Sequence, residues 1–241
     1  MYRFIFSIAL LHCLLAVPTA SQAKAYLGPT DFRIGTDIMR PAYYGAYEGT
    51  GPQCEVSSSV DFTRLMITGG YGFGSLKREG HNKKQQVYSV YTNKGQYFRA
   101  GLDYNFISRT PDSNVASLGL RCAISLFEDH LKSRVIYAHA GGNTDVPSLV
   151  GHGPVVDTKH KRAWAQWFEL VGGIQAKVWA SLYAGLTIRY KFRLRISKAF
   201  NHIPYEVLGW GQHGNHGWGI NYYLLVRFPL KQFSEDEYLD T

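Results

Sequence analysis

The chain has 241 residues, a formal net charge of +8 and 18% charged residues, below the roughly 25% of an average soluble domain. Its 25 glycines and 15% aromatic residues argue against a coiled coil, a disordered chain and a helical soluble domain. Three cysteines are too few for a disulfide scaffold, and no run reaches the ~18 apolar residues of a transmembrane helix. A β-rich protein with an aromatic surface remains.

Residues 1–23 have the pattern of a secretory signal peptide. Arg3 supplies the positive start, residues 4–17 form the apolar stretch, and small residues at 21 and 23 predict cleavage before Lys24. The mature chain therefore enters an oxidising or periplasmic space.

Alternation of apolar and polar residues with period two, which is typical of β-strands, dominates the mature chain. Strands of about 9–11 residues are long enough to cross a membrane when tilted, whereas soluble sandwiches more often use ~5–6. The eight alternating segments are residues 32–40, 53–61, 65–76, 96–106, 115–126, 164–178, 182–195 and 218–228.

Short and long connections follow each other in turn, and the strand number is even, as in outer-membrane barrels. The short connections are 62–64, 107–114 and 179–181, and the long ones are 41–52, 77–95, 127–163 and 196–217. We expect an all-β, eight-stranded, antiparallel up-and-down transmembrane barrel over 32–228, with four long surface loops. A periplasmic segment at 24–31 precedes it, and an acidic periplasmic tail at 229–241 follows it.

The charged residues of the strands share one face. In a membrane barrel this face points into the lumen, where eight strands leave just enough room for side chains, and where opposite charges must pair because unpaired buried ions are costly. Counting Lys177 and Arg193, this face carries eight cations and four anions. The excess cations stay solvated at the barrel ends or make the lumen attract anions. The charges expected to line and fill the lumen are Arg33, Asp37, Glu55, Arg99, Asp103, Arg121, Glu169, Arg189, Lys191 and Arg227.

Four blocks of sequence resemble a family of small Bacteroidota outer-membrane proteins known only as a domain of unknown function. The resemblance implies a β-barrel in the outer membrane and no catalytic residues, and it is weak over 127–163. Outer-membrane barrels usually end on an aromatic residue that the barrel assembly machinery recognises, and Phe228 is the best match to it here. The blocks are 33–37 with Arg40 and Pro41, 97–106, 167–194, and 203–205 leading into 218–222.

No catalytic, cofactor or metal site is expected. Every histidine after His12 falls in a predicted long connection, which argues against a Ser–His esterase on the barrel wall because the base must reach the serine hydroxyl. His213 and His216 have metal-ligand spacing, but no Cys, Asp or Glu accompanies them. The glycine-rich run 69–74 lacks the Lys-Ser/Thr of a phosphate loop.

The expected partners are outer-membrane lipid and the barrel assembly machinery. The segment 77–95 carries five cations against Glu79, so lipopolysaccharide phosphates are a possible ligand. A secreted chain with no recognition element is not expected to bind nucleic acid. Cys54 and Cys122 lie on the apolar face of non-adjacent strands, too far apart to form a disulfide. We expect a monomer.

Four functions remain open. The first is a structural or interaction protein that acts through its loops around a filled lumen. The second is a narrow, weakly anion-preferring pore, and the third is a soluble calycin-like ligand carrier with an apolar interior. An enzyme is the least favoured.

Overall fold

The structure, a computed structural model, describes residues 28–39, 41, 53–82, 87–107, 110–137, 151–197, 204–212 and 214–231. At residues 81–82, 87–88, 134–137 and 151–156 it describes the backbone alone. The predicted signal peptide at 1–23 and residues 232–241 of the predicted tail lie outside the described residues. So does most of the predicted connection 41–52.

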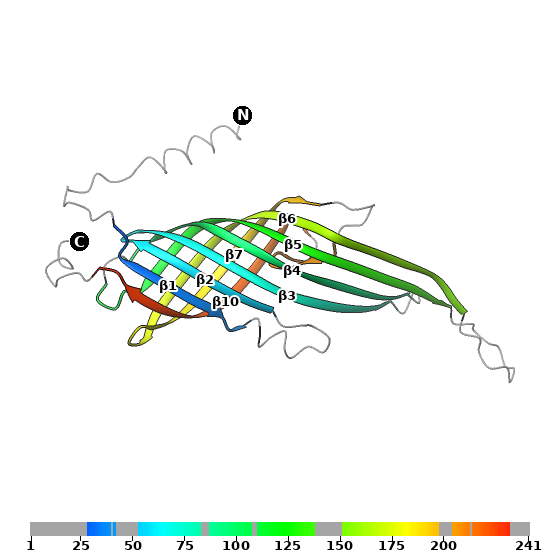
Figure 1. Ribbon diagram of the computed structural model, residues 1–241, viewed down its shortest axis with the longest axis horizontal. Coiled ribbons are helices and arrows are strands. Elements are labelled where there is room, and N and C mark those ends of the chain that lie inside the picture. The colour runs from blue at the N-terminus through cyan, green and yellow to red at the C-terminus, as the bar shows by residue number, and fades with distance from the viewer. Residues whose placement is uncertain are drawn as a thin grey trace, which may run out of the picture.

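Antiparallel pairing in the described part of the chain closes eight strands into a barrel, in the order β1-β10-β7-β6-β5-β4-β3-β2, with β1 also paired to β2 (Figure 1). The predicted eight-stranded up-and-down barrel is confirmed. In these residues no helix is long and apolar enough to cross a membrane. The barrel strands are β1 (Asp31–Asp37), β2 (Gln53–Phe62), β3 (Leu65–Asn82), β4 (Val87–Asn105), β5 (Val115–Tyr137), β6 (Gly151–Trp179), β7 (Leu182–Ile196) and β10 (His216–Pro229).

Short turns and both described ends of the chain gather at one end of the barrel. The Leu230 amide donates to the Thr30 carbonyl over 2.9 Å, and the Arg227 amide donates to the Ser181 carbonyl over 2.9 Å. Thr63 and Ala180 occupy the two-residue turns with φ of 73° and 44°, because a tight hairpin turn requires left-handed backbone. We call this the turn end. Asp31 and Pro229, predicted to lie in the flanking segments, already belong to β1 and β10.

Four strands run well past the ring at the opposite end (Figure 1). β3 and β4 pair as far as Asn82 and Val87, and β5 and β6 as far as Tyr137 and Gly151. The sequence prediction of connections at 77–95 and 127–163 is therefore wrong for most of both segments. Their outward positions include Lys77, Lys94 and Glu128, and their inward positions mix buried polar and apolar residues. The contrast between an apolar and a polar face that marked the other strands is therefore weak here. We call β3 75–82, β4 87–95, β5 127–137 and β6 151–163 the strand extension.

The predicted surface loop 196–217 also differs from expectation, because its described middle turns into the barrel. Residues 204–212, here called the inner hairpin, contain β8 (Glu206–Val207) and β9 (Gly211–Gln212), which pair antiparallel. Val207, Leu208 and Trp210 are buried. This short apolar run lies inside because β4, β5 and β6 offer it apolar partners there.

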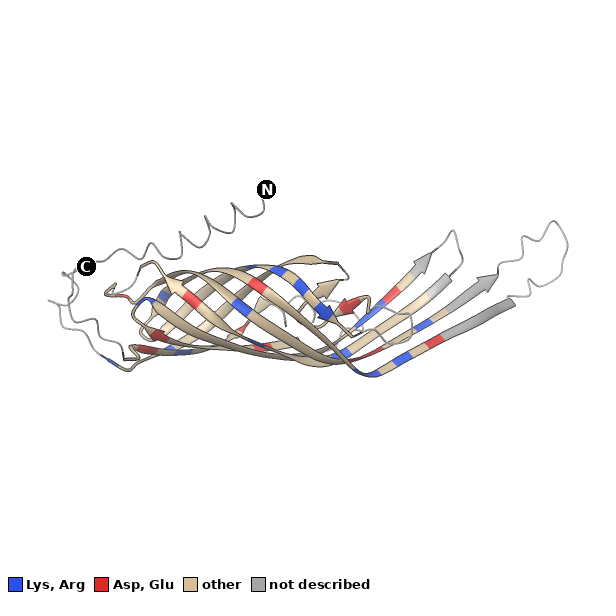
Figure 2. Ribbon diagram, turned by 90° about the horizontal axis from the view of Figure 1, so that it is seen from above, with Lys and Arg blue, Asp and Glu red and all other residues tan. Residues whose placement is uncertain are grey.

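The barrel has opposite polarity on its two faces. Figure 2 shows the acidic and basic residues distributed along the barrel and the strand extension. Most of the strand charges inside the barrel are buried, whereas large apolar side chains on the outward positions stay exposed. The outward positions include Ile34, Val56, Ile67, Phe98, Leu102, Leu120, Phe168, Leu170, Ile188, Ile220, Leu224 and Val226.

Candidate functional site

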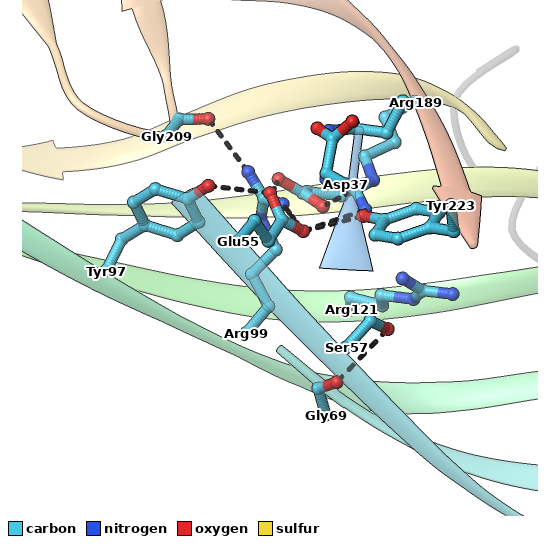
Figure 3. Close-up of polar contacts among 12 residues, drawn as sticks. Asp37, Glu55, Ser57, Gly69, Tyr97, Arg99, Arg121, Arg189, Gly209 and Tyr223 are labelled. Carbon is cyan, nitrogen blue, oxygen red and sulfur yellow. Dashed lines mark hydrogen bonds and ion pairs between the residues drawn. The ribbon is translucent and has the colours of Figure 1, made fainter. Parts of the chain in front are cut away.

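Glu55 of β2 is the centre of a buried polar network inside the barrel (Figure 3). Its Oε1 accepts hydrogen bonds from Arg99 Nη1 at 2.6 Å, from Tyr223 OH at 2.6 Å and from Arg189 Nη2 at 3.2 Å. Its Oε2 accepts one from Tyr97 OH at 2.6 Å. The side chain of Glu55 is 1% exposed, so its charge is stabilised by these donors instead of by water.

A second carboxylate, Glu169 of β6, completes the network. Arg99 Nε lies 3.2 Å from Glu169 Oε1, and Arg189 Nε lies 3.8 Å from Glu169 Oε2. The indole Nε1 of Trp167 donates to Glu169 over 2.6 Å. Two arginines thus bridge two glutamates from β2, β4, β6 and β7, and the four opposite charges neutralise each other where burial makes unpaired ions costly.

Lys191 joins this network to the inner hairpin. Its Nζ donates to the carbonyl oxygens of Gly209 and Trp210 over 2.8 and 2.9 Å, and Arg99 Nη2 donates to the Gly209 carbonyl over 3.2 Å. Gly209 has a φ of 81°, and a Cβ there would lie 2.7 Å from the Tyr97 ring. Only glycine therefore lets the hairpin turn approach the two cations so closely.

The hairpin is also held at its other strand. Arg78 Nε of β3 donates to the Glu206 carboxylate over 3.1 Å, and the Tyr91 hydroxyl and Asn93 Nδ2 each donate to the Glu206 carbonyl over 2.9 Å. Burial raises the pKa of the Tyr91 hydroxyl, which keeps this donor protonated. These bonds come from the parts of β3 and β4 that belong to the strand extension.

Apolar packing joins the hairpin to one side of the barrel wall, formed by β4, β5 and β6. Trp210 packs on Trp167 with ring centroids 5.9 Å apart. A cavity of about 230 Å³ remains between the hairpin and strands β2, β3, β7 and β10. The buried cluster around the hairpin comprises Tyr97, Ala123, Phe127, Ala163, Ala165, Trp167, Val207, Leu208 and Trp210.

A separate set of pairs occupies the turn end. Arg33 donates to Gln175 Oε1 over 2.7 Å and to the Ser113 carbonyl over 2.8 Å. Asp31 lies 3.6 Å from Arg33 and 2.6 Å from Arg227. These contacts tie β1, β6 and β10 and the β4–β5 turn together.

Nine of the ten charges that the sequence placed in the lumen are buried, and Arg227 is half-buried. Besides the residues above, Arg121 pairs with Asp103, and Asn221 donates to Asp37. Lys177 is exposed, and its Nζ lies 3.3 Å from Asp112 at the turn end. The pairs divide into a central group and a turn-end group.

Sequence reasoning missed two carboxylates and the aromatic donors. Asp31 is two residues before Arg33 and so faces the same side of the strand. Extending the first predicted strand by one residue would have placed Asp31 in the lumen. Tyr97, Trp167 and Tyr223 stood on the polar face of predicted strands, where period two places them inside. Glu206 gave no signal, because it lies in a connection whose inward path the sequence does not encode locally.

The histidine placement needs a correction. Five histidines predicted to lie in connections belong to strands β3, β5, β6 and β10, namely His81, His130, His152, His160 and His216. His130 contacts Asp157 at 2.5 Å, and His160 contacts Asp129 at 2.7 Å. His213 lies outside the described residues, and the His216 ring stacks on Tyr190. Within the described ranges, no cluster of three or more His, Cys, Asp or Glu side chains has a metal-binding arrangement.

Cys54 and Cys122 are free thiols on β2 and β5, as the sequence predicted.

The family described as "Domain of unknown function (DUF6048)" matches residues 1–232. The chain belongs to this family. Among curated proteins, none matches this family member in sequence.

Two solved structures are similar to this family member. One is Ail, the attachment invasion locus protein of Yersinia pestis, at 10% identity and a TM-score of 0.34, covering 83% of this chain and 99% of Ail. The other is Neisserial surface protein A, at 11% identity and a TM-score of 0.35, covering 84% of this chain and 96% of that protein. The barrel assignment rests on the strand pairing of this chain.

Proposed function

We propose that the protein is an integral outer-membrane β-barrel with a closed lumen, which acts in surface interactions through its strand extension. The observation that carries the proposal is the inverted polarity of the barrel. Glu55, Glu169, Arg99 and Arg189 are buried inside, while Leu120 on the outside is 66% exposed. A barrel with charged residues inside and apolar residues outside is unfavourable in water. It is favourable when lipid hydrocarbon surrounds the barrel.

The lengths of the apolar faces support a membrane-spanning role. On β7 every second residue from Leu182 to Leu194 is apolar or aromatic, and the intervening residues include Thr187, Arg189 and Lys191. A tilted strand needs about 9–11 residues to cross the bilayer. A signal peptide at 1–23 would deliver the chain to the periplasm, where the barrel assembly machinery inserts such barrels into the outer membrane.

Two blockages favour a structural or interaction role over conduction. The inner hairpin lies inside the barrel on the side of the strand extension, and the Glu–Arg network joins β2, β4, β6 and β7 across the lumen. A narrow, weakly anion-preferring pore remains the alternative, since cations exceed anions among the lumen charges. Conductance in planar bilayers separates the two: the closed barrel is silent, and the pore passes chloride.

The soluble calycin-like carrier is disfavoured because it requires an apolar interior and a polar exterior. We assign the protein no catalytic role and no cofactor, and we propose that it works as a monomer. The resemblance in sequence also implies an origin in the Bacteroidota, which stays a prediction.

The proposal is tested by the gel mobility of urea-washed membranes, unheated against boiled in SDS. A folded membrane barrel stays in the membrane fraction and migrates differently before and after boiling. Recovery in the soluble periplasmic fraction with no change in mobility would overturn the membrane assignment.

A further inference from the structure

A β-bulge interrupts the outer part of β6. Pairing with β5 passes from Phe127 opposite Ala163 directly to Asp129 opposite His160, so Glu128 faces both Lys161 and Arg162. In a regular strand, successive side chains point to opposite faces. The extra residue breaks this rule, and the side chains of Lys161 and Arg162 are both exposed while those at 160 and 163 are buried.

The bulge lies where the outward surface changes from apolar to charged. One outward-facing row across β3, β4, β5 and β6 consists of Phe73, Gln96, Leu126 and Trp164, each opposite the next. The following outward row toward the strand extension consists of Ser75, Lys94 and Glu128, with the bulge beside them.

A groove of about 660 Å³ straddles this boundary. The part of the groove nearer the turn end is apolar and aromatic. The part nearer the strand extension carries three cations and one acid. We call it the bulge groove. It is lined by Phe73, Lys94, Gly95, Gln96, Leu126, Phe127, Glu128, Lys161, Arg162, Ala163 and Trp164.

The cations of the bulge groove are available for a ligand. Among the described residues, no ion pair within 4 Å joins Lys94, Lys161 or Arg162 to an acid. The nearby acids on the strand extension are used elsewhere: Asp129 turns inward to His160, and Asp157 contacts His130 and Lys132. Of the described residues that line the groove, Glu128 is therefore the one acid, beside three cations.

We propose that the bulge groove binds a phosphate-bearing lipid of the outer leaflet. The phosphate lies between Lys94, Lys161 and Arg162, and an acyl chain runs along Leu126, Trp164 and Phe73 toward the apolar band. Arginine can hold two phosphate oxygens at once, and lysine adds compact positive charge. A free phosphate ion would leave the apolar half of the groove unused, which favours the lipid. The inference rests on the proposed membrane location.

The test uses the full mature chain reconstituted in phosphatidylcholine bilayers that contain diphosphoryl lipid A, with binding measured by native mass spectrometry. The test variant is K94Q/K161Q/R162Q. The matched control K77Q/K132Q/K159Q removes the same charge from the strand extension outside the groove. We expect the test variant to bind lipid A about tenfold more weakly, while the control binds as the wild type does.

Each other outcome contradicts the inference in a distinguishable way. Equal weakening in both triple variants would mean diffuse charge attraction. Displacement of lipid A by excess inorganic phosphate would mean an ion site. Unchanged binding in the test variant would rule out the groove. Failure of the wild-type chain to enter bilayers would instead overturn the proposed function.

Discussion

Single side chains in the lumen are held by several partners at once, so one substitution there affects a whole network. Glu55→Gln removes a charge while Arg99 and Arg189 stay buried. Leaving buried charge uncompensated costs about 3 kcal/mol or more. We expect the free energy of unfolding to fall by this amount in urea titrations in phospholipid vesicles.

The control for this variant is Glu79→Gln, which removes the same charge from a side chain that is 49% exposed. Exposed charges contribute within about 0.5 kcal/mol, so its unfolding midpoint should match that of the wild type. Equal stabilities of the two variants would contradict the account of the central network.

Gly72 illustrates how the backbone makes room for this network. A Cβ at Gly72 would lie 2.1 Å from the Tyr97 ring, whose hydroxyl donates to Glu55. The missing side chain at Gly72 therefore leaves the space that the buried Tyr97 ring occupies.

Gly72→Ala should therefore lower the free energy of unfolding by about 1–3 kcal/mol. Gly172→Ala is the matched control, because nothing lies within 4 Å of a Cβ at that outward position. Urea unfolding in vesicles, followed by tryptophan fluorescence, compares the two. A larger loss in Gly172→Ala would refute the packing argument.

At the scale of strands, the sequence is informative where one face is apolar and the other polar. All eight barrel strands and the placement of Glu55, Arg99 and Arg189 inside followed from parity, because a half-exposed strand has a period-two pattern. The strand extension lacks this contrast, as Lys77, Arg78 and Glu79 are consecutive. Its strands were therefore missed.

The inner hairpin was missed for a different reason. Residues 204–210 form a short mixed run that suits a loop as well as a plug. Their inward path is determined by partners more than a hundred residues away, such as Asn93 and Arg99. The local sequence pattern does not predict contacts between residues so far apart in the chain.

The outward apolar faces lead to an element-level prediction. Leu120 on β5 lies between Leu102 and Leu170 on its neighbours, inside the exposed apolar surface. Leu120→Arg should destabilise the barrel in vesicles by about 2–4 kcal/mol, because a lipid-facing cation near the bilayer centre is costly. A soluble barrel would tolerate the same change.

Leu230→Arg is the control for this substitution. Leu230 is 56% exposed but follows β10 at the turn end, so the arginine can reach water at a cost of about 0–1 kcal/mol. Urea unfolding in vesicles measures both variants. Similar stabilities would contradict the placement of the exposed apolar residues in hydrocarbon.

Considered as a whole, the molecule has two unlike ends. Short turns and both described chain ends lie at one end, and the strand extension with its exposed charges lies at the other. A barrel inserted from the periplasm keeps its termini and short turns there and presents its longer segments outside. The bulge groove would then lie at the outer leaflet, so its lipid assignment and the orientation of the barrel must agree.

Orientation can be read from single cysteines in a chain in which Cys54 and Cys122 are replaced by alanine. Lys132→Cys places a thiol on the strand extension, where the Lys132 side chain is 57% exposed, and Ser181→Cys places one in the β6–β7 turn. With a membrane-impermeant maleimide on intact cells, we expect Lys132→Cys to be labelled and Ser181→Cys to be protected. Both should be labelled after lysis, which shows that each thiol is reactive. Labelling of Ser181→Cys alone on intact cells would reverse the orientation and place the bulge groove on the periplasmic side, away from the outer leaflet.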